Sequence, residues 1–332
     1  VYYINYLQLF NKLMNLNSID KKIFFNLLRI RMVEKKIAEE YVKWQMRCPV
    51  HLSIGQEIVS ACLQTIWKKS DYVVSSHRAH AHYLAKNGSL KKMISEIYGK
   101  STGCSSGKGG SMHLIDQSNG FMGSTAIVAN TIPVGVGLGF SIKYKKKKSL
   151  SFICIGDATI ETGVFFESLN FSLIKDLPVV FICENNSYSV YTEINERQPK
   201  NRKIHKFVEK SGIKTFFSEG LKPREIHNKI SKAVNYSRKN NKPSFVEVMT
   251  FRYREHVGPN FDNHLNYRSK KYLNYWKSKD HLNFFKNKIS DITFHNKQKL
   301  IEKEINAAFR FALKSNFPKE QDISKHLFKN YL

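Results

Sequence analysis

The stretch SLSFICIGDATIETGVFFESLNFSLIKDLPVVFICENN, residues 149–186, decides the fold. It begins with an apolar run that ends in Gly156-Asp157, which is typical of a buried strand. Residues 159–175 have helical spacing, and residues 178–183 form a second apolar run. A strand, a helix and a strand in this order predict a βαβ unit, hence an α/β fold with a parallel sheet. Three residues of the helix are expected to face the core: Phe165, Leu169 and Ile174.

Polar residues follow both predicted strands. Asp157 ends the first, and Asn186 lies just beyond the second, 29 residues later. Ligands of parallel sheets bind at the carboxyl ends of strands, so neighbouring strands would bring both side chains to one crevice. A carboxylate and an amide oxygen suit Mg²⁺, and backbone N–H groups near Ala158 and Thr159 can meet a diphosphate. The alternative is two ordinary turns; the spacing favours a magnesium–diphosphate site.

The rest of the chain predicts further elements of the same fold. Helical spacing is present over 20–46, over 53–67 with Ser53 as its cap, over 133–144 and over 222–238. Strands are expected at 71–76 and 244–251. Residues 88–123 are expected to form a long irregular polar loop, which is usually functional. Within it, Gly107–Ser111 resembles part of a phosphate-binding P-loop but lacks the first glycine and the preceding strand, which excludes that motif.

The composition is that of a folded protein with a strongly basic balance. The chain has 332 residues, 42% of them hydrophobic, and a formal net charge of +27. This charge raises the alternative of a nucleic-acid-binding protein. The basic residues are scattered, however, and the one dense run, Lys145–Lys148, is expected to be a solvated helix end or loop. The composition therefore favours no specific nucleic-acid partner.

The cysteines and the hydropathy of the sequence bear on the cellular compartment of the protein. The five cysteines form no CxxC pair, and Cys154 and Cys183 lie in apolar runs where buried thiols are expected. An odd count without framework spacing indicates a reducing, cytoplasmic setting. The sequence has no run of 18 apolar residues, so it predicts no membrane-spanning helix.

Three regions are expected along the chain. Residues 1–19 would be an N-terminal extension, and a start at Met14 would remove part of it from the natural protein. Residues 20–275 would form the α/β domain, and residues 276–332 a basic helical C-terminal region.

The sequence also resembles a known protein family. The segment 156–186 looks like the thiamine-diphosphate motif, which begins Gly-Asp-Gly and ends in Asn-Asn about thirty residues later. More narrowly, the chain resembles the α subunit of 2-oxoacid dehydrogenase E1 components (pyruvate, branched-chain and acetoin dehydrogenases). Five more segments fall in the family's order: HLSIGQE (51–57), HRAHAHYLAKNG (77–88), GKGGSMH (107–113), GSTAIVANTIPVGVG (123–137) and RYREHVGP (252–259).

The resemblance implies roles for individual residues. Asp157, Asn186 and the Tyr188 carbonyl would bind Mg²⁺, and the backbone of Gly156, Ala158 and Thr159 would approach the diphosphate. Arg78 would pair with phosphate oxygens, with His77 beside it. Val128 would contact the aminopyrimidine. His256 would lie near the diphosphate and the reacting centre, and His51 would face the substrate.

The resemblance also implies an incomplete enzyme. The family decarboxylates a 2-oxo acid and passes the acyl group to a lipoyl-type acceptor on an acyltransferase. The glutamate that activates the cofactor comes from a separate β subunit, and this sequence offers no candidate for it, so an α₂β₂ heterotetramer is expected. Another thiamine-diphosphate enzyme (a decarboxylase, a transketolase-like enzyme or a sugar-pathway synthase) remains an alternative, although GKGGSMH and RYREHVGP favour the E1 interpretation.

The sequence departs from the family at several positions. Ala158 replaces the third motif glycine, which a negative backbone φ would permit. Ala126 and Asn130 stand where glycine is frequent, and His77 replaces a common tyrosine. Val257 follows His256, where animal pyruvate dehydrogenases have a regulatory serine, so phosphorylation at that position is excluded.

Overall fold

The fold is built on one parallel sheet, as the sequence predicts. The computed structural model describes residues 16–286 and 288–325. Its main sheet has six strands in the order β2-β1-β3-β4-β8-β7, all paired in parallel. The strands are β1 (Tyr72–Ser75), β2 (Phe121–Ser124), β3 (Ser151–Gly156), β4 (Val179–Asn185), β7 (Lys214–Ser218) and β8 (Ser244–Met249). The two strands that decide the fold, β3 and β4, are neighbours, which confirms the βαβ prediction.

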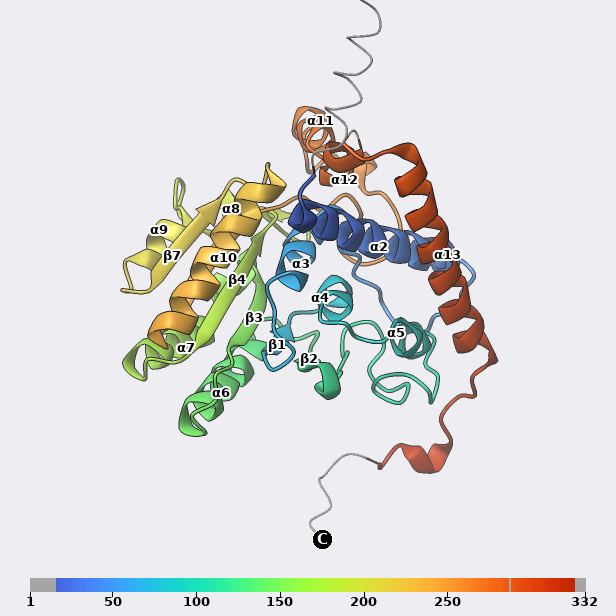
Figure 1. Ribbon diagram of the computed structural model, residues 1–332, viewed down its shortest axis with the longest axis horizontal. Coiled ribbons are helices and arrows are strands. Elements are labelled where there is room, and N and C mark those ends of the chain that lie inside the picture. Colours follow the sequence, from blue (N-terminus) through green and yellow to red (C-terminus); the bar gives the residue numbers. More distant parts are fainter. Residues whose placement is uncertain (1–15, 287, 326–332) are drawn as a thin grey trace, which may run out of the picture.

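Helices cover both faces of this sheet (Figure 1). On one face, Phe152, Cys154 and Ile182 pack in a core with residues of the helices Ser18–Tyr41, Glu57–Gln64, His80–Ala85, Leu90–Ile97, Pro223–Asn240 and Asp291–Lys314. On the other face, Ile153 and Phe181 pack with residues of the helices Thr131–Tyr144, Gly163–Ile174 and Ile204–Glu209. Alternate residues of a strand therefore pack into two different cores, one on each face of the sheet. This explains why buried parallel strands are apolar throughout.

The helices agree with most of the predicted ranges. They are α2 (Ser18–Tyr41), α3 (Glu57–Gln64), α4 (His80–Ala85), α5 (Leu90–Ile97), α6 (Thr131–Tyr144), α7 (Gly163–Ile174), α8 (Ile194–Arg197), α9 (Ile204–Glu209), α10 (Pro223–Asn240), α11 (Lys270–Ser278), α12 (His281–Lys286) and α13 (Asp291–Lys314). Short 3₁₀ turns lie at Gln117–Asn119, Asp157–Glu161, Asn263–Leu265 and Glu320–Asp322, and a small hairpin pairs β5 (Tyr188–Ser189) with β6 (Thr192–Glu193).

Three local predictions were wrong. Ser53 does not cap α3; its N–H donates to the Glu34 carboxylate, and the helix begins four residues later. Ile174 is 68% exposed, because it is the last residue of α7, although Phe165 and Leu169 are buried as predicted. Residues 88–123 are not irregular throughout. They contain α5, which Ser89 caps and whose apolar residues recur at helical spacing, and the edge strand β2.

The C-terminal helix belongs to the main core. Ile301, Ile305 and Phe309 of α13 are buried in the same cluster as α2 and α5, and α13 runs beside these helices in Figure 1. The division between residues 275 and 276 stays a prediction, and α11 runs across it. Residues 1–15 of the expected N-terminal extension lie outside the described residues. Among those that are described, no helix has the length and apolarity that crossing a membrane requires.

Candidate functional site

One pocket gathers the residues that the sequence singled out. It lies at the carboxyl ends of β3 and β4 and has a volume of about 190 Å³. All eleven residues proposed for the site line it, although they come from distant parts of the chain; their roles stay predictions. They are His51, His77, Arg78, Val128, Gly156, Asp157, Ala158, Thr159, Asn186, Tyr188 and His256.

The strand ends place the two expected metal ligands. β3 and β4 are in register, with Gly156 opposite Glu184, so Asp157 and Asn186 emerge from the same edge of the sheet. Asp157 is 2% exposed. The Asn186 amide donates to Gln56 Oε1 at 3.1 Å, and its Oδ1 accepts the N–H of Tyr188 at 3.0 Å. The amide oxygen is therefore already oriented toward the turn that carries the third proposed ligand.

Asp157 is paired with a cation of the chain itself. Arg197, the last residue of α8, places Nη2 2.5 Å from Asp157 Oδ2, and its other nitrogen pairs with Glu161. Burial raises the pKa of Asp157 to about 6, although the pairing with Arg197 opposes this shift. A buried carboxylate strongly favours a cationic partner, so this position is suited to a cation.

Three histidines converge on one point of the pocket. The ring centroids of His51, His77 and His256 are 4.6–5.3 Å apart. One ligand nitrogen from each lies within 4.8 Å of the other two. His51 Nδ1 is buried without a hydrogen-bond partner among the described residues. A buried polar atom without a hydrogen-bond partner indicates a group to which a bound ligand would supply the hydrogen bond.

These imidazoles are neutral at physiological pH. Burial, and next the positive charge of Arg78, lower the pKa of His51 to about 2 and those of His77 and His256 to about 3. A neutral imidazole has one donor and one acceptor nitrogen, so each ring can donate a hydrogen bond to a ligand or accept one from it.

Arg78 supplies the fixed positive charge. It is buried, and its guanidinium donates to the carbonyls of Leu52 at 2.6 Å and of His256 at 3.2 Å. Burial, together with the nearby charge of Arg252, lowers its pKa to about 9, which still leaves it charged at neutral pH. No carboxylate forms an ion pair with Arg78 within the described residues, so its charge is available to an anionic ligand.

A buried carboxylate joins three of the recognised segments. Glu34 of α2 accepts the N–H of Ser53 at 2.9 Å and lies 2.9 Å from His80 Nδ1. The other nitrogen of His80 lies 2.7 Å from the hydroxyl of Ser111, in the GKGGSMH segment. His82 lies 2.9 Å from the Ser75 hydroxyl. His80 and His82 are thus engaged elsewhere, and the structure does not assemble a metal site from His77, His80 and His82.

A glycine turn positions Gln56. Gly55 has φ +104°, and a Cβ there would lie 2.1 Å from the carbonyl oxygen of Phe251, so the turn requires glycine. Its N–H donates at 2.8 Å to Glu57, which Arg31 neutralises inside the core. The turn directs Gln56 to Asn186, so the HLSIGQE segment supports the metal end of the pocket.

The glycine-rich loop at 103–110 binds an internal anion. The Glu96 carboxylate accepts the N–H groups of Ser105, Gly107, Gly109 and Gly110 at 2.7–3.2 Å. The side chain is fully buried. The loop therefore has the N–H cradle of a phosphate-binding loop but fills it with its own glutamate, in agreement with the exclusion of a P-loop.

Ala158 is compatible with the motif. It is partly exposed toward the pocket, in the 3₁₀ turn that follows β3. It is absent from the residues with positive φ, so the backbone here does not require glycine. Strain lies elsewhere around the pocket, at Ala129 (φ 68°) and at the β-branched Val190 (φ 55°). Strained positions of this kind cluster at functional sites.

Sequence reasoning missed three polar residues of the site. Gln56 and Glu184 line the pocket, and Arg197 neutralises Asp157. Gln56 and Glu184 stand inside the recognised segments, so their position was a signal for them. For Arg197 the sequence has no such signal, because the bond depends on how the β5–β6 hairpin folds back over the turn after β3.

Comparisons with known proteins agree with this geometry. The family model for the dehydrogenase E1 component matches residues 26–321. Proteins named pyruvate dehydrogenase E1 component subunit alpha are similar to the chain: the one from Rickettsia felis is 34% identical, with 92% of this chain and 95% of the relative covered. The one from Porphyra purpurea is 30% identical, with 92% of each covered, and the one from Rhizobium meliloti is 32% identical over 76% of this chain and 71% of the relative.

The match spans nearly all of the described fold, including the strand ends, the histidines and Arg78. The chain belongs to the dehydrogenase E1 component family.

Proposed function

We propose that the chain is the α subunit of a two-subunit thiamine-diphosphate enzyme that decarboxylates a 2-oxo acid such as pyruvate and passes the acyl group to a lipoyl-type acceptor. Relatives over nearly its full length are named as α subunits of the pyruvate dehydrogenase E1 component. The observation that carries the proposal is the convergence of Asp157, Asn186 and Arg78 at one edge of the sheet.

The metal would be Mg²⁺, held by Asp157, Asn186 and the Tyr188 carbonyl. These are hard oxygen ligands, and Mg²⁺ commonly takes one or two carboxylates and completes its shell with phosphate oxygens and water. The fit rests on Asp157, whose buried carboxylate is already neutralised by a positive group. Arg197 would have to yield that position to the metal.

The diphosphate would lie between the metal and Arg78. The backbone of Gly156, Ala158 and Thr159 lines the same pocket and can donate to phosphate oxygens. His77 and His256 lie beside Arg78 and can donate as neutral imidazoles. Val128, half exposed at the rim, would contact the aminopyrimidine.

When bound, thiamine diphosphate supplies the nucleophilic carbon that attacks the keto group of the substrate. The chain's own contribution is orientation and proton handling. His51 and His256 would contact the substrate, because as neutral imidazoles each offers one donor and one acceptor nitrogen for hydrogen bonds. His51 Nδ1, which has no partner among the described residues, is the nitrogen we assign to that contact.

A β subunit would complete the site. The pocket volume of about 190 Å³ is below the roughly 300–1,000 Å³ of pockets that enclose a whole ligand. Exposed apolar side chains also gather on α6 and α7, beside the pocket strands, as at interfaces: Val134, Phe140, Tyr144, Phe166, Phe171 and Ile174. The partner would supply the activating glutamate in an α₂β₂ heterotetramer, and a lipoyl-bearing acyltransferase would receive the acyl group. The free thiols of all five cysteines suit a cytoplasmic location.

Reconstitution tests this function. The chain is co-expressed with a β subunit of the same enzyme family; decarboxylation is measured with pyruvate and branched-chain 2-oxo acids, and cleavage is measured with acetoin. We expect activity from the assembly, little from the chain alone, and a fall in kcat of roughly 10²–10³ for His256→Ala. The variant Glu302→Ala, at an exposed residue of α13, serves as the matched control. Full activity of the chain without a partner would contradict the proposal.

A further inference from the structure

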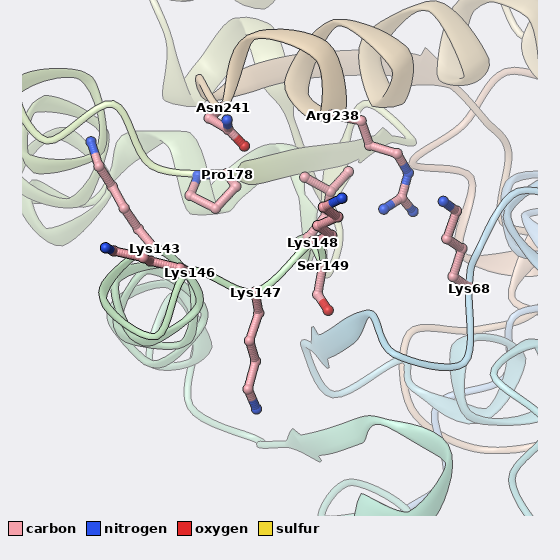
Figure 2. Close-up of a pocket in the computed structure, with 10 residues that line it drawn as sticks. Lys68, Lys143, Lys146, Lys147, Lys148, Ser149, Pro178, Arg238 and Asn241 are labelled. Carbon is pink, nitrogen blue, oxygen red and sulfur yellow. The ribbon is translucent and has the colours of Figure 1, made fainter.

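A second hollow lies at the opposite end of the sheet from the candidate active site. Its volume is about 580 Å³, and its lining comes from the segments that precede β1, β3, β4 and β8 (Figure 2). The six residues of β3 separate it from Asp157 by about 20 Å at the usual rise per residue. It is therefore not a part of the candidate active site. The residues that line it are Lys68, Lys143, Lys146, Lys147, Lys148, Ser149, Leu150, Pro178, Arg238 and Asn241.

Six of these ten residues are cationic and none is acidic. Among the described residues, Arg238 alone of the six has a carboxylate partner, the buried Asp71. Lys143 donates to the carbonyl of Lys175 at 2.6 Å, and Lys147 reaches the hydroxyl of Tyr72 at 3.3 Å. The amino groups of Lys68, Lys146 and Lys148 have no hydrogen-bond or ion-pair partner within residues 16–286 and 288–325.

Three of the six cations face one part of the hollow. In Figure 2 the side chains of Lys68, Lys148 and Arg238 point toward it, whereas Lys143, Lys146 and Lys147 extend away from it. Lys146 has φ 51°, so the loop after α6 bends sharply before it enters β3. Like charges held together repel, and a bound anion with several charges would offset that repulsion. The Ser149 hydroxyl and the Asn241 amide add neutral donors.

We propose that this hollow, the lysine pocket, binds a compact triphosphate-bearing anion. Its volume is within the range of small-molecule sites, about 300–1,000 Å³, which favours a small ligand over an extended chain. None of the ten lining residues is aromatic, whereas single-stranded nucleic acids are held by base stacking on aromatic rings. The ammonium groups of the lysines are compact charges on flexible side chains. They can pair with phosphate oxygens, but they do not select any second chemical group of the ligand. The proposal does not depend on the function proposed above.

The test is a calorimetric titration of the full-length chain with inorganic tripolyphosphate. ATP forms a second arm, sodium sulfate at equal ionic strength a third, and a single-stranded RNA oligonucleotide a fourth. Similar affinity for tripolyphosphate and ATP would identify the triphosphate group as the recognised part, and tighter binding of ATP would add a contribution from its nucleoside. Binding of tripolyphosphate no tighter than sulfate, or displaced by RNA at equal charge, would overturn the proposal.

Matched variants locate the binding. Lys68→Ala/Lys148→Ala removes two exposed, unpaired lysines of the pocket, and Lys299→Ala/Lys303→Ala removes two exposed lysines of α13. We expect the first pair to weaken tripolyphosphate binding by about tenfold or more and the second by less than about twofold. Equal losses in the two lysine pairs would show diffuse attraction to a basic protein and overturn the proposal.

Discussion

Two buried carboxylates of this molecule differ in their partners, and we assign structure to one and metal binding to the other. Glu96 accepts four backbone N–H groups of the glycine-rich loop, all from its own chain segment. Asp157 has a single cationic side chain as its ionic partner, and Arg197 comes from a distant short helix. Backbone donors are permanent, whereas a side chain can be exchanged for a metal ion. An exchangeable partner, more than burial or charge, distinguishes the carboxylate to which we assign metal binding.

The largest effect on stability should come from replacing Glu96, whose partners are backbone N–H groups. Glu96→Ala would leave four loop N–H groups without an acceptor, so we expect the free energy of unfolding to fall by about 3 kcal/mol or more. Urea unfolding of this variant and of the exposed control Glu167→Ala would measure it. A loss below about 1 kcal/mol would show that Glu96 does not organise the loop.

The next effect is the pH dependence that Asp157 contributes. Its pKa is about 6 in the fold, above the ordinary 3.8, so the folded chain binds the extra proton between these values. Stability from this group is therefore greatest below about pH 4 and is lost as pH rises toward 6, by up to about 3 kcal/mol. Asp157→Asn should lack this loss. If the stability–pH curves of the unchanged protein and of Asp157→Asn run parallel, the pKa of Asp157 is not raised in the fold.

A smaller effect should follow from removing the exchangeable partner. Arg197→Met leaves Asp157 buried without its cation, and we expect a loss of roughly 1–3 kcal/mol at pH 7. Because the competing positive group is gone, Mn²⁺, used as a probe for Mg²⁺, should bind more tightly, as followed by electron paramagnetic resonance. Arg47→Met, at an exposed arginine, is the control. Weaker Mn²⁺ binding in Arg197→Met would mean that Arg197 supports the metal and does not compete with it.

The smallest effect concerns the departure inside the motif. Since the backbone at Ala158 does not require glycine, Ala158→Gly should lower stability by only about 0.5–1 kcal/mol, through the added freedom of the unfolded chain. Affinity for thiamine diphosphate should stay within about threefold. A large gain in affinity would show instead that the methyl group obstructs the diphosphate.

The sequence predicted those parts that depend on local pattern. The apolar runs and the helical spacing between them predicted β3, α7 and β4, and the strand ends predicted that Asp157 and Asn186 would meet. The resemblance to a family added Arg78 and the histidines, which periodicity alone could not bring to the same pocket.

The remainder depends on contacts between segments far apart in the chain. The bond from Arg197 to Asp157 depends on the β5–β6 hairpin, and the cradle around Glu96 depends on a loop whose turns carry no periodic signal. The edge strand β7 was missed because its residues are only partly buried and alternate weakly. The convergence of His51, His77 and His256 likewise requires three separate loops to fold against one another.

The central claim is that the ends of β3 and β4 hold a magnesium–diphosphate group. The most direct test is a calorimetric titration of thiamine diphosphate, with Mg²⁺ present, into the assembly of this chain with its β subunit. Asp157→Ala and Asn186→Ala should each lower the affinity by about a hundredfold or more, and Glu302→Ala, at an exposed residue of α13, should not change it. Unchanged affinity in both strand-end variants would contradict the assignment.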